Sequence, residues 1–125
     1  MASTIAVIAL DAVEPRPIAD FWCAVLGWEI LEESAEGITI GAADGTWPTI
    51  DVFTVPERKA VKNRLHFDLR ACDLSRDEEL DRLLSLGALR VDIGQPAGAS
   101  WVVLADPEGN EFCLLLRTES EARNG

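Results

Sequence analysis

The chain has 125 residues, of which 48% are hydrophobic, and its 11 basic and 22 acidic side chains give a net charge of −11. This length suits one domain with a buried core, and the apolar content excludes a largely disordered chain. The negative charge opposes binding to a phosphate backbone, and the apolar runs are too short to span a bilayer, so we expect neither a nucleic-acid nor a membrane partner.

The first half of the chain predicts one strand, one helix and three further strands. A β-branched apolar run indicates a strand over 4–10. A helix is expected to begin at Pro15, where a proline is tolerated in the first turn, and to end at Gly27. Short apolar runs separated by turn residues then predict strands over 28–31, 38–42 and 49–55.

The second half repeats this order of elements. Residues 65–71 alternate strictly between apolar and polar side chains, as in a strand, and an amphipathic helix is expected over 74–86 with Gly87 at its end. Three more strands are predicted over 89–93, 101–105 and 111–116. In this repeat Val7 and His66 are equivalent, because each lies seven residues before the acidic residue that precedes a helix.

The predicted fold class is therefore α+β, with two tandem βαβββ modules in one domain over 1–117. Module one covers 4–55 and module two 65–117. The basic linker 56–64 is either a solvated connection or a lip that contacts an anion. The polar tail 118–125 is expected to fray.

The three cysteines are Cys23, Cys72 and Cys113, an odd number without CxxC spacing. This pattern predicts no disulfide framework and favours a reducing, cytoplasmic compartment. We expect Cys23 and Cys72 to be small buried apolar residues.

Three sequence segments carry a resemblance to a known family: FWCAVLGW at 21–28, VPE at 55–57 with KNRLHFDLR at 62–70, and WVVLADPEGNEFC at 101–113. They resemble the vicinal oxygen chelate superfamily of glyoxalase I, bleomycin-resistance proteins and extradiol dioxygenases, and more narrowly its small bacterial glyoxalase-like domains. The resemblance implies sheets that curl into a cup with the helices outside, a ligand in the concavity and a homodimer.

In metal-dependent members of this superfamily, the first and last strands of each module supply one ligand each. Carried over to this chain, those places are Val7, a residue near Phe53, His66 and Cys113. Only His66 matches the pattern, while Cys113 stands where a carboxylate is expected, with Asp51 and Glu111 as substitutes. We therefore predict no cofactor, and a divalent metal held through His66 and Cys113 is the alternative.

His66 is the only histidine, and strand alternation places it with Asp68 and Arg70 on one face. One interpretation is a structural histidine satisfied by Asp68, Glu111 or the backbone. The other is a histidine that contacts a ligand or transfers a proton, with Glu111 as its orienting group or acid, so His66 and Glu111 are the candidate catalytic pair.

A larger set of residues is expected to contact the ligand. Trp22 and Trp28 are assigned to the core, whereas Trp47 and Trp101 are candidates to stack on a planar guest. Acidic side chains in the cup favour a cationic guest. The predicted ligand-binding residues are Asp51, Phe53, His66, Asp68, Arg70, Trp101, Glu111 and Cys113.

These observations leave three functions open. The favoured one is metal-independent binding of an organic, cationic or planar small molecule. The alternative is an enzyme of the superfamily, of the lyase, isomerase or dioxygenase type, or a metal-free acid–base catalyst that uses His66 with Glu111. A partner domain without chemistry has no positive support in the sequence.

Overall fold

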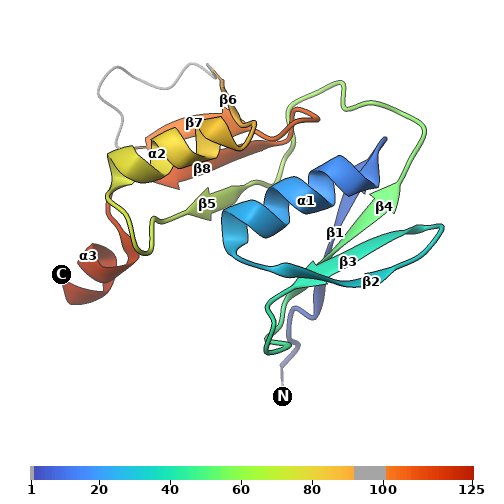
Figure 1. The fold of residues 1–125 in the computed structure, drawn as a ribbon, viewed down its shortest axis with the longest axis horizontal. Helices are drawn as coiled ribbons and strands as arrows, with labels where there is room; N and C mark the ends of the chain where they lie inside the picture. The colour runs from blue at the N-terminus through green and yellow to red at the C-terminus, as the bar shows by residue number, and fades with distance from the viewer. Residues whose placement is uncertain (1, 92–100) are drawn as a thin grey trace. The chain divides into compact units, whose positions relative to one another are not determined.

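The computed structural model describes residues 2–91 and 101–125. The chain divides into two compact units, Met1–Arg58 and Lys59–Gly125, which we describe one at a time. Each unit contains a four-stranded mixed sheet and a helix that packs on it (Figure 1). The predicted α+β fold of two βαβββ modules is confirmed.

The first unit contains five elements joined in the predicted order. They are β1 (Val7–Ala12), α1 (Pro15–Leu26), β2 (Glu29–Glu33), β3 (Gly37–Gly41) and β4 (Thr49–Thr54). The strands lie in the order β1-β4-β3-β2, in which β1 is parallel to β4 and the other pairs are antiparallel. The helix α1 contacts all four strands.

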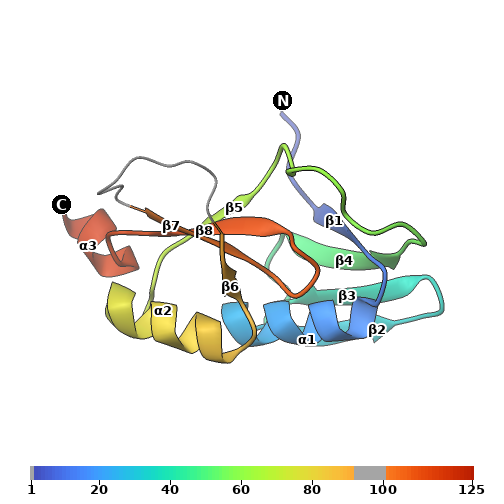
Figure 2. The same ribbon diagram turned by 90° about the horizontal axis from the view of Figure 1, so that it is seen from above.

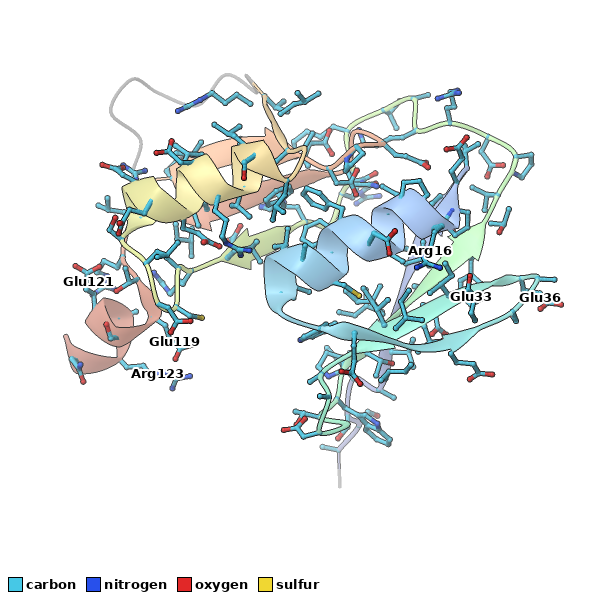
Figure 3. All side chains as sticks on the ribbon, viewed as in Figure 1. Arg16, Glu33, Glu36, Glu119, Glu121 and Arg123 are labelled. Carbon is cyan, nitrogen blue, oxygen red and sulfur yellow. The ribbon has the colours of Figure 1, made fainter. Side chains whose placement is uncertain are left out.

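The sequence of α1 explains both its ends and its packing. Pro15 stands in the first turn, and Gly27 ends the helix in the left-handed conformation with φ of 67°. One face of the helix buries an apolar set consisting of Ile18, Ala19, Phe21, Trp22 and Val25. On its exposed side, Arg16 extends toward Glu33 of β2, with 3.6 Å between Nη1 and Oε1 (Figure 3).

Alternation along the strands gives the first sheet two different faces. The face toward α1 buries Ile38, Ile40, Ile50 and Val52. The opposite face, which we call the far face of module one, carries Val7, Ala9, Thr39, Asp51 and Phe53. Val7 and Phe53 are exposed there.

Within residues 59–91 and 101–125, the second unit contains six elements. They are β5 (Phe67–Leu69), α2 (Arg76–Ser85), β6 (Leu89–Arg90), β7 (Trp101–Ala105), β8 (Glu111–Leu115) and α3 (Glu119–Asn124). The strand order is β5-β8-β7-β6, with β5 parallel to β8 as β1 is to β4. Figure 2 shows α2 along one side of this sheet, as α1 lies along one side of its own.

The second sheet also has a helix-facing side and a far face. Phe112 and Leu114 of β8 are fully buried on the side that α2 contacts, where Leu83 of the helix is also buried. The alternate residues of β8, Glu111 and Cys113, therefore point to the other side. We call this side the far face of module two.

The length of β5, the burial of two cysteines and the structure of the tail differ from the expectations. The first strand of module two is shorter than predicted: β5 pairs with β8 at three positions only, Phe67–Leu69, and Leu65, which precedes this ladder, is 80% exposed. Cys72 is exposed and Cys23 half-buried, so neither is a core residue. The strand predicted over 89–93 lies partly outside the described residues; within them, Leu89–Arg90 form β6.

The tail forms a short helix instead of fraying. In α3, the Thr118 hydroxyl accepts the Glu121 amide, and the Glu121 carboxylate accepts the Thr118 amide, which is a capping box. The Glu119 amide also donates to the Ala71 carbonyl at 2.9 Å, so the first turn is attached to the end of β5. Arg123 lies beside Glu119 on this helix (Figure 3).

Candidate functional site

Three side chains whose atoms can coordinate a metal ion or contact a small molecule converge on the far face of module two. The donor atoms of His66, Asp68 and Cys113 all lie within 4.8 Å of one another. Asp68 and Cys113 are direct register partners in the parallel pair of β5 and β8, and His66 precedes Asp68 by two residues, on the same side of the strand. The His66 Nε2 atom is 3.2 Å from Asp68 Oδ1.

The cluster combines two accessible groups with a buried one. The side chains of His66 and Asp68 are 39% and 51% exposed, whereas Cys113 is 6% exposed. Burial raises the pKa of the Cys113 thiol, and the charge of Asp68 and a hydrogen bond to it raise that pKa further, against a smaller opposite effect of Lys62. At neutral pH Cys113 is therefore a thiol, which is a poor nucleophile.

Glu111, the other polar residue of β8 on this face, has different partners from His66. Its Oε2 accepts Lys59 Nζ at 2.8 Å, and its Oε1 accepts the Asn63 backbone amide at 3.1 Å. Burial raises the pKa of the Glu111 carboxyl, but the hydrogen bonds from Lys59 and Asn63 outweigh it and leave the pKa below its ordinary value. Glu111 is therefore an ionised carboxylate, not a proton donor, at neutral pH.

The hairpin between β7 and β8 is built on a buried aspartate. Asp106 is 1% exposed, and its Oδ1 accepts the backbone amides of Glu108 and Asn110 at 2.9 and 3.0 Å. The Asn110 side chain donates to Asp106 Oδ2 at 2.9 Å and accepts the Asn63 side-chain amide at 2.8 Å. The hairpin thus fixes one end of the linker.

The remaining predicted ligand-binding residues lie elsewhere. Asp51 and Phe53 belong to the far face of module one, where Asp51 Oδ1 accepts the Thr39 hydroxyl at 2.6 Å. Arg70 lies after β5 and donates to the Arg117 carbonyl at 3.0 Å, which attaches the tail. Trp101 is half-buried at the start of β7, opposite Leu115 of β8.

The strand register refines the equivalence between the modules. When Val7 is aligned with His66, Ala9 falls on Asp68. Ala9 pairs with Asp51, as Asp68 pairs with Cys113, so the module-one counterpart of Cys113 is Asp51 and not Phe53. Ala12 and Ala71, aligned in the same way, are both 1% exposed.

The donor set of the cluster can be compared with what a metal ion requires. One imidazole nitrogen, one carboxylate oxygen and one thiolate sulfur make three protein ligands, the number that catalytic zinc sites use. The thiolate suits zinc better than Mn²⁺, which prefers oxygen ligands. The set fits a thiophilic ion, although His66 and Asp68 already contact each other and Cys113 must lose its proton to bind.

The sequence predicted His66, Asp68 and Cys113 as site residues and offered Asp68 as one possible partner of His66, but it did not include Asp68 among the candidate metal ligands. It also missed Lys59 and Asn63, because their contacts with Glu111 join positions about fifty residues apart. The basic composition of the linker was the available signal, and it was read as a solvated segment or an anion-binding lip.

The chain was also compared with known proteins. The family model described as glyoxalase-like domain matches residues 7–115. No curated protein matches the chain. A fosfomycin resistance protein FosX from Mesorhizobium loti has 15% identity over 98% of this chain and 99% of its own, with a TM-score of 0.70.

Two further solved structures have similar folds. FosX from Listeria monocytogenes, complexed with Mn(II) and sulfate, has 17% identity, full coverage of both chains and a TM-score of 0.70. A glyoxalase/bleomycin resistance protein/dioxygenase family enzyme from Burkholderia phytofirmans PsJN has 17% identity over 90% of this chain and 97% of its own, with a TM-score of 0.65. The domain match over most of the chain shows that it belongs to the glyoxalase-like domain family, and these neighbours share its fold.

Proposed function

We propose that this chain binds a small organic molecule on the far face of module two, without a metal ion, through His66, Asp68 and Cys113. The observation that carries the proposal is the convergence of these three groups within 4.8 Å. His66 and Asp68 are accessible enough to contact a ligand. Asp68 supplies a carboxylate for a cationic or hydrogen-bond-donating guest.

The contacts inside the cluster support binding without a metal. Asp68 accepts a hydrogen bond from the Cys113 thiol, and its Oδ1 lies 3.2 Å from His66 Nε2, so the three side chains already contact one another. A planar guest can also use Trp101, which opens the adjoining strand β7.

Calorimetry in the presence of EDTA tests this function. Berberine, a planar aromatic cation, would be titrated into the protein beside a neutral and an anionic aromatic compound. We expect binding of the cation that persists in EDTA and is lost in His66→Ala, while Leu65→Ala, a change at the exposed neighbouring position, leaves it unchanged. Absence of EDTA-resistant binding to all three compounds would contradict the proposal.

A second candidate is an enzyme of the superfamily that uses a divalent ion, and it is favoured by the three-donor set and by the Mn(II) complex of FosX. His66, Asp68 and Cys113 would hold the ion. Such an ion supplies Lewis acidity toward a substrate oxygen. Elemental analysis after incubation with zinc, manganese or ferrous iron tests this candidate, for which we expect about one ion per chain, lost in Cys113→Ser.

The compartment and the oligomeric state remain predictions. Within the described residues, no helix has both the length and the apolar character needed to cross a membrane. The homodimer implied by the superfamily is tested by light scattering after size exclusion.

A further inference from the structure

Glu111 is a largely buried charged group that the proposed ligand cluster does not use. Its side chain is 12% exposed and that of its partner Lys59 19%, so the pair is shielded from water. Each carboxylate oxygen accepts a hydrogen bond from the linker, one from Lys59 Nζ and the other from the Asn63 backbone amide. Charge-assisted hydrogen bonds with these partners are among the stronger contacts a surface segment can make. We call this arrangement the linker clasp.

The clasp is attached to a rigid support. The Asn63 side chain donates to Asn110 Oδ1, and Asn110 is in turn held by the buried Asp106. The linker end is therefore bound to the hairpin at Asn110 as well as to β8 at Glu111. These contacts involve residues from one unit of the chain only.

The clasp has a direct consequence for His66, which lies three residues after Asn63 and just before the first residue of β5. The ladder between β5 and β8 comprises only Phe67–Leu69, so His66 is held by the ladder on one side only. On the other side, the chain is fixed next at Asn63. Without that second attachment, the backbone around His66 has more conformations available and the imidazole loses its defined position on Asp68.

We propose that Glu111 is a positioning residue: by holding Lys59 and the Asn63 amide, it fixes the linker end from which His66 reaches Asp68 and Cys113. This inference depends on the proposed function in one respect only, namely that a ligand contacts His66. The clasp itself can be tested in the free protein. Glu111 then acts through His66 and does not touch the ligand.

The first experiment is limited digestion of the native protein with trypsin, which cleaves after basic residues of the linker. Cleavage after Lys62 and Arg64 reports opening of the clasp, because cleavage follows the population of the open form when closing is fast. We expect Glu111→Gln and Lys59→Met to raise this cleavage about tenfold, the effect of losing one charge-assisted hydrogen bond. Arg58→Met, at the exposed neighbouring position, is the matched control and should change nothing.

The second experiment follows the ring resonances of His66 by NMR, which are unambiguous because the chain has one histidine. Asp68→Asn provides the reference spectrum of an imidazole without its carboxylate partner. We expect Glu111→Gln and Lys59→Met to shift the His66 resonances toward that reference, and Lys59→Arg, which keeps the cation, to restore the wild-type shifts. A residue with a purely structural role would leave these shifts unchanged at temperatures where the protein is folded.

The outcomes separate the two proposals. Unchanged His66 resonances in Glu111→Gln and in Lys59→Met would overturn the inference, even if berberine binds. If the His66 resonances shift toward the reference in both variants while the wild-type protein binds no ligand, the inference is supported and the proposed function is contradicted. If Glu111→Gln fails to fold, Lys59→Met with its Lys59→Arg rescue decides the question alone.

Discussion

The two modules share their strand order and their helix packing but differ in the chemistry of their far faces. At the places where module two has His66, Asp68 and Cys113, module one has Val7, Ala9 and Asp51. The helix-facing sides remain apolar in both modules because each must bury a core against its helix. The repeat therefore constrains the core positions, whereas the far face carries different side chains in each module.

The turn between the last two strands differs in the same way. In module two the turn aspartate, Asp106, is buried and bonds to the backbone and to Asn110. In module one Asp44 is exposed and bonds to Thr46 of its own turn. Through Asn110, the module-two turn supports a neighbouring segment, the linker.

The largest expected effect is the loss of stability in Asp106→Ala. Removing this carboxylate leaves the partly buried amides of Glu108 and Asn110 without this acceptor, at a cost of about 3 kcal/mol in the free energy of unfolding. Urea unfolding measures the change. Asp44→Ala is the module-one control, and a loss as large as that of Asp106→Ala would contradict the contrast between the two turns.

The next effect is that of Glu111→Gln and its dependence on pH. We expect a loss of about 2 kcal/mol at pH 7, because the charge-assisted bond to Lys59 is removed. The pKa of Glu111 in the folded protein lies below its ordinary value of 4.5. The stabilisation by the ionised carboxylate is therefore complete above pH 4.5 and is lost as the pH falls through the lower folded-state pKa.

Urea unfolding of both proteins between pH 7 and pH 3 checks this dependence. The difference between wild type and variant should shrink at the acidic end. A difference that stays constant over this range would show that the ionised carboxylate is not the source of the stability.

A smaller effect is expected on the reactivity of Cys113. The charge of Asp68 and its hydrogen bond to the thiol contribute to the raised pKa of Cys113, after burial, so Asp68→Asn should lower that pKa. We expect alkylation of Cys113 by iodoacetamide at pH 8 to be up to about tenfold faster, as one pKa unit allows. Peptide mapping separates Cys113 from the other cysteines. As a control, Asp51→Asn, a change at the module-one counterpart of Cys113, should leave the alkylation rate of Cys113 unchanged.

The smallest effect concerns the polar contact of module one. Thr39→Val removes the hydrogen bond to Asp51 at 2.6 Å and should cost about 1 kcal/mol, because Asp51 is only partly buried and regains water. Thermal unfolding measures this loss. A loss of binding to the berberine probe in this variant would mean that module one also takes part in the site, and would weaken the contrast between the far faces.

The repeat, the order of its elements and most core-facing positions could be predicted from the amino-acid sequence alone. Pro15, Gly27 and the alternation of residues 65–71 are local signals, and local signals state which element forms and which side chains share a face. The same alternation placed His66 and Asp68 on one face, whereas Cys113 entered the candidate site only through the resemblance to a known family. The length of β5 could not be predicted in this way, because it depends on how many of its residues pair with β8, a distant segment of the chain.

Only the tertiary structure decided which polar groups meet. The pairing of β5 with β8 places Asp68 beside Cys113. Glu111 accepts hydrogen bonds from Lys59 and Asn63 in the linker clasp. His66 contacts Asp68 instead of Glu111. The pattern of a single strand states which face a side chain occupies but not its neighbour on the next strand. Strand register and the path of the linker supply that neighbour, and both follow from packing between distant segments of the chain.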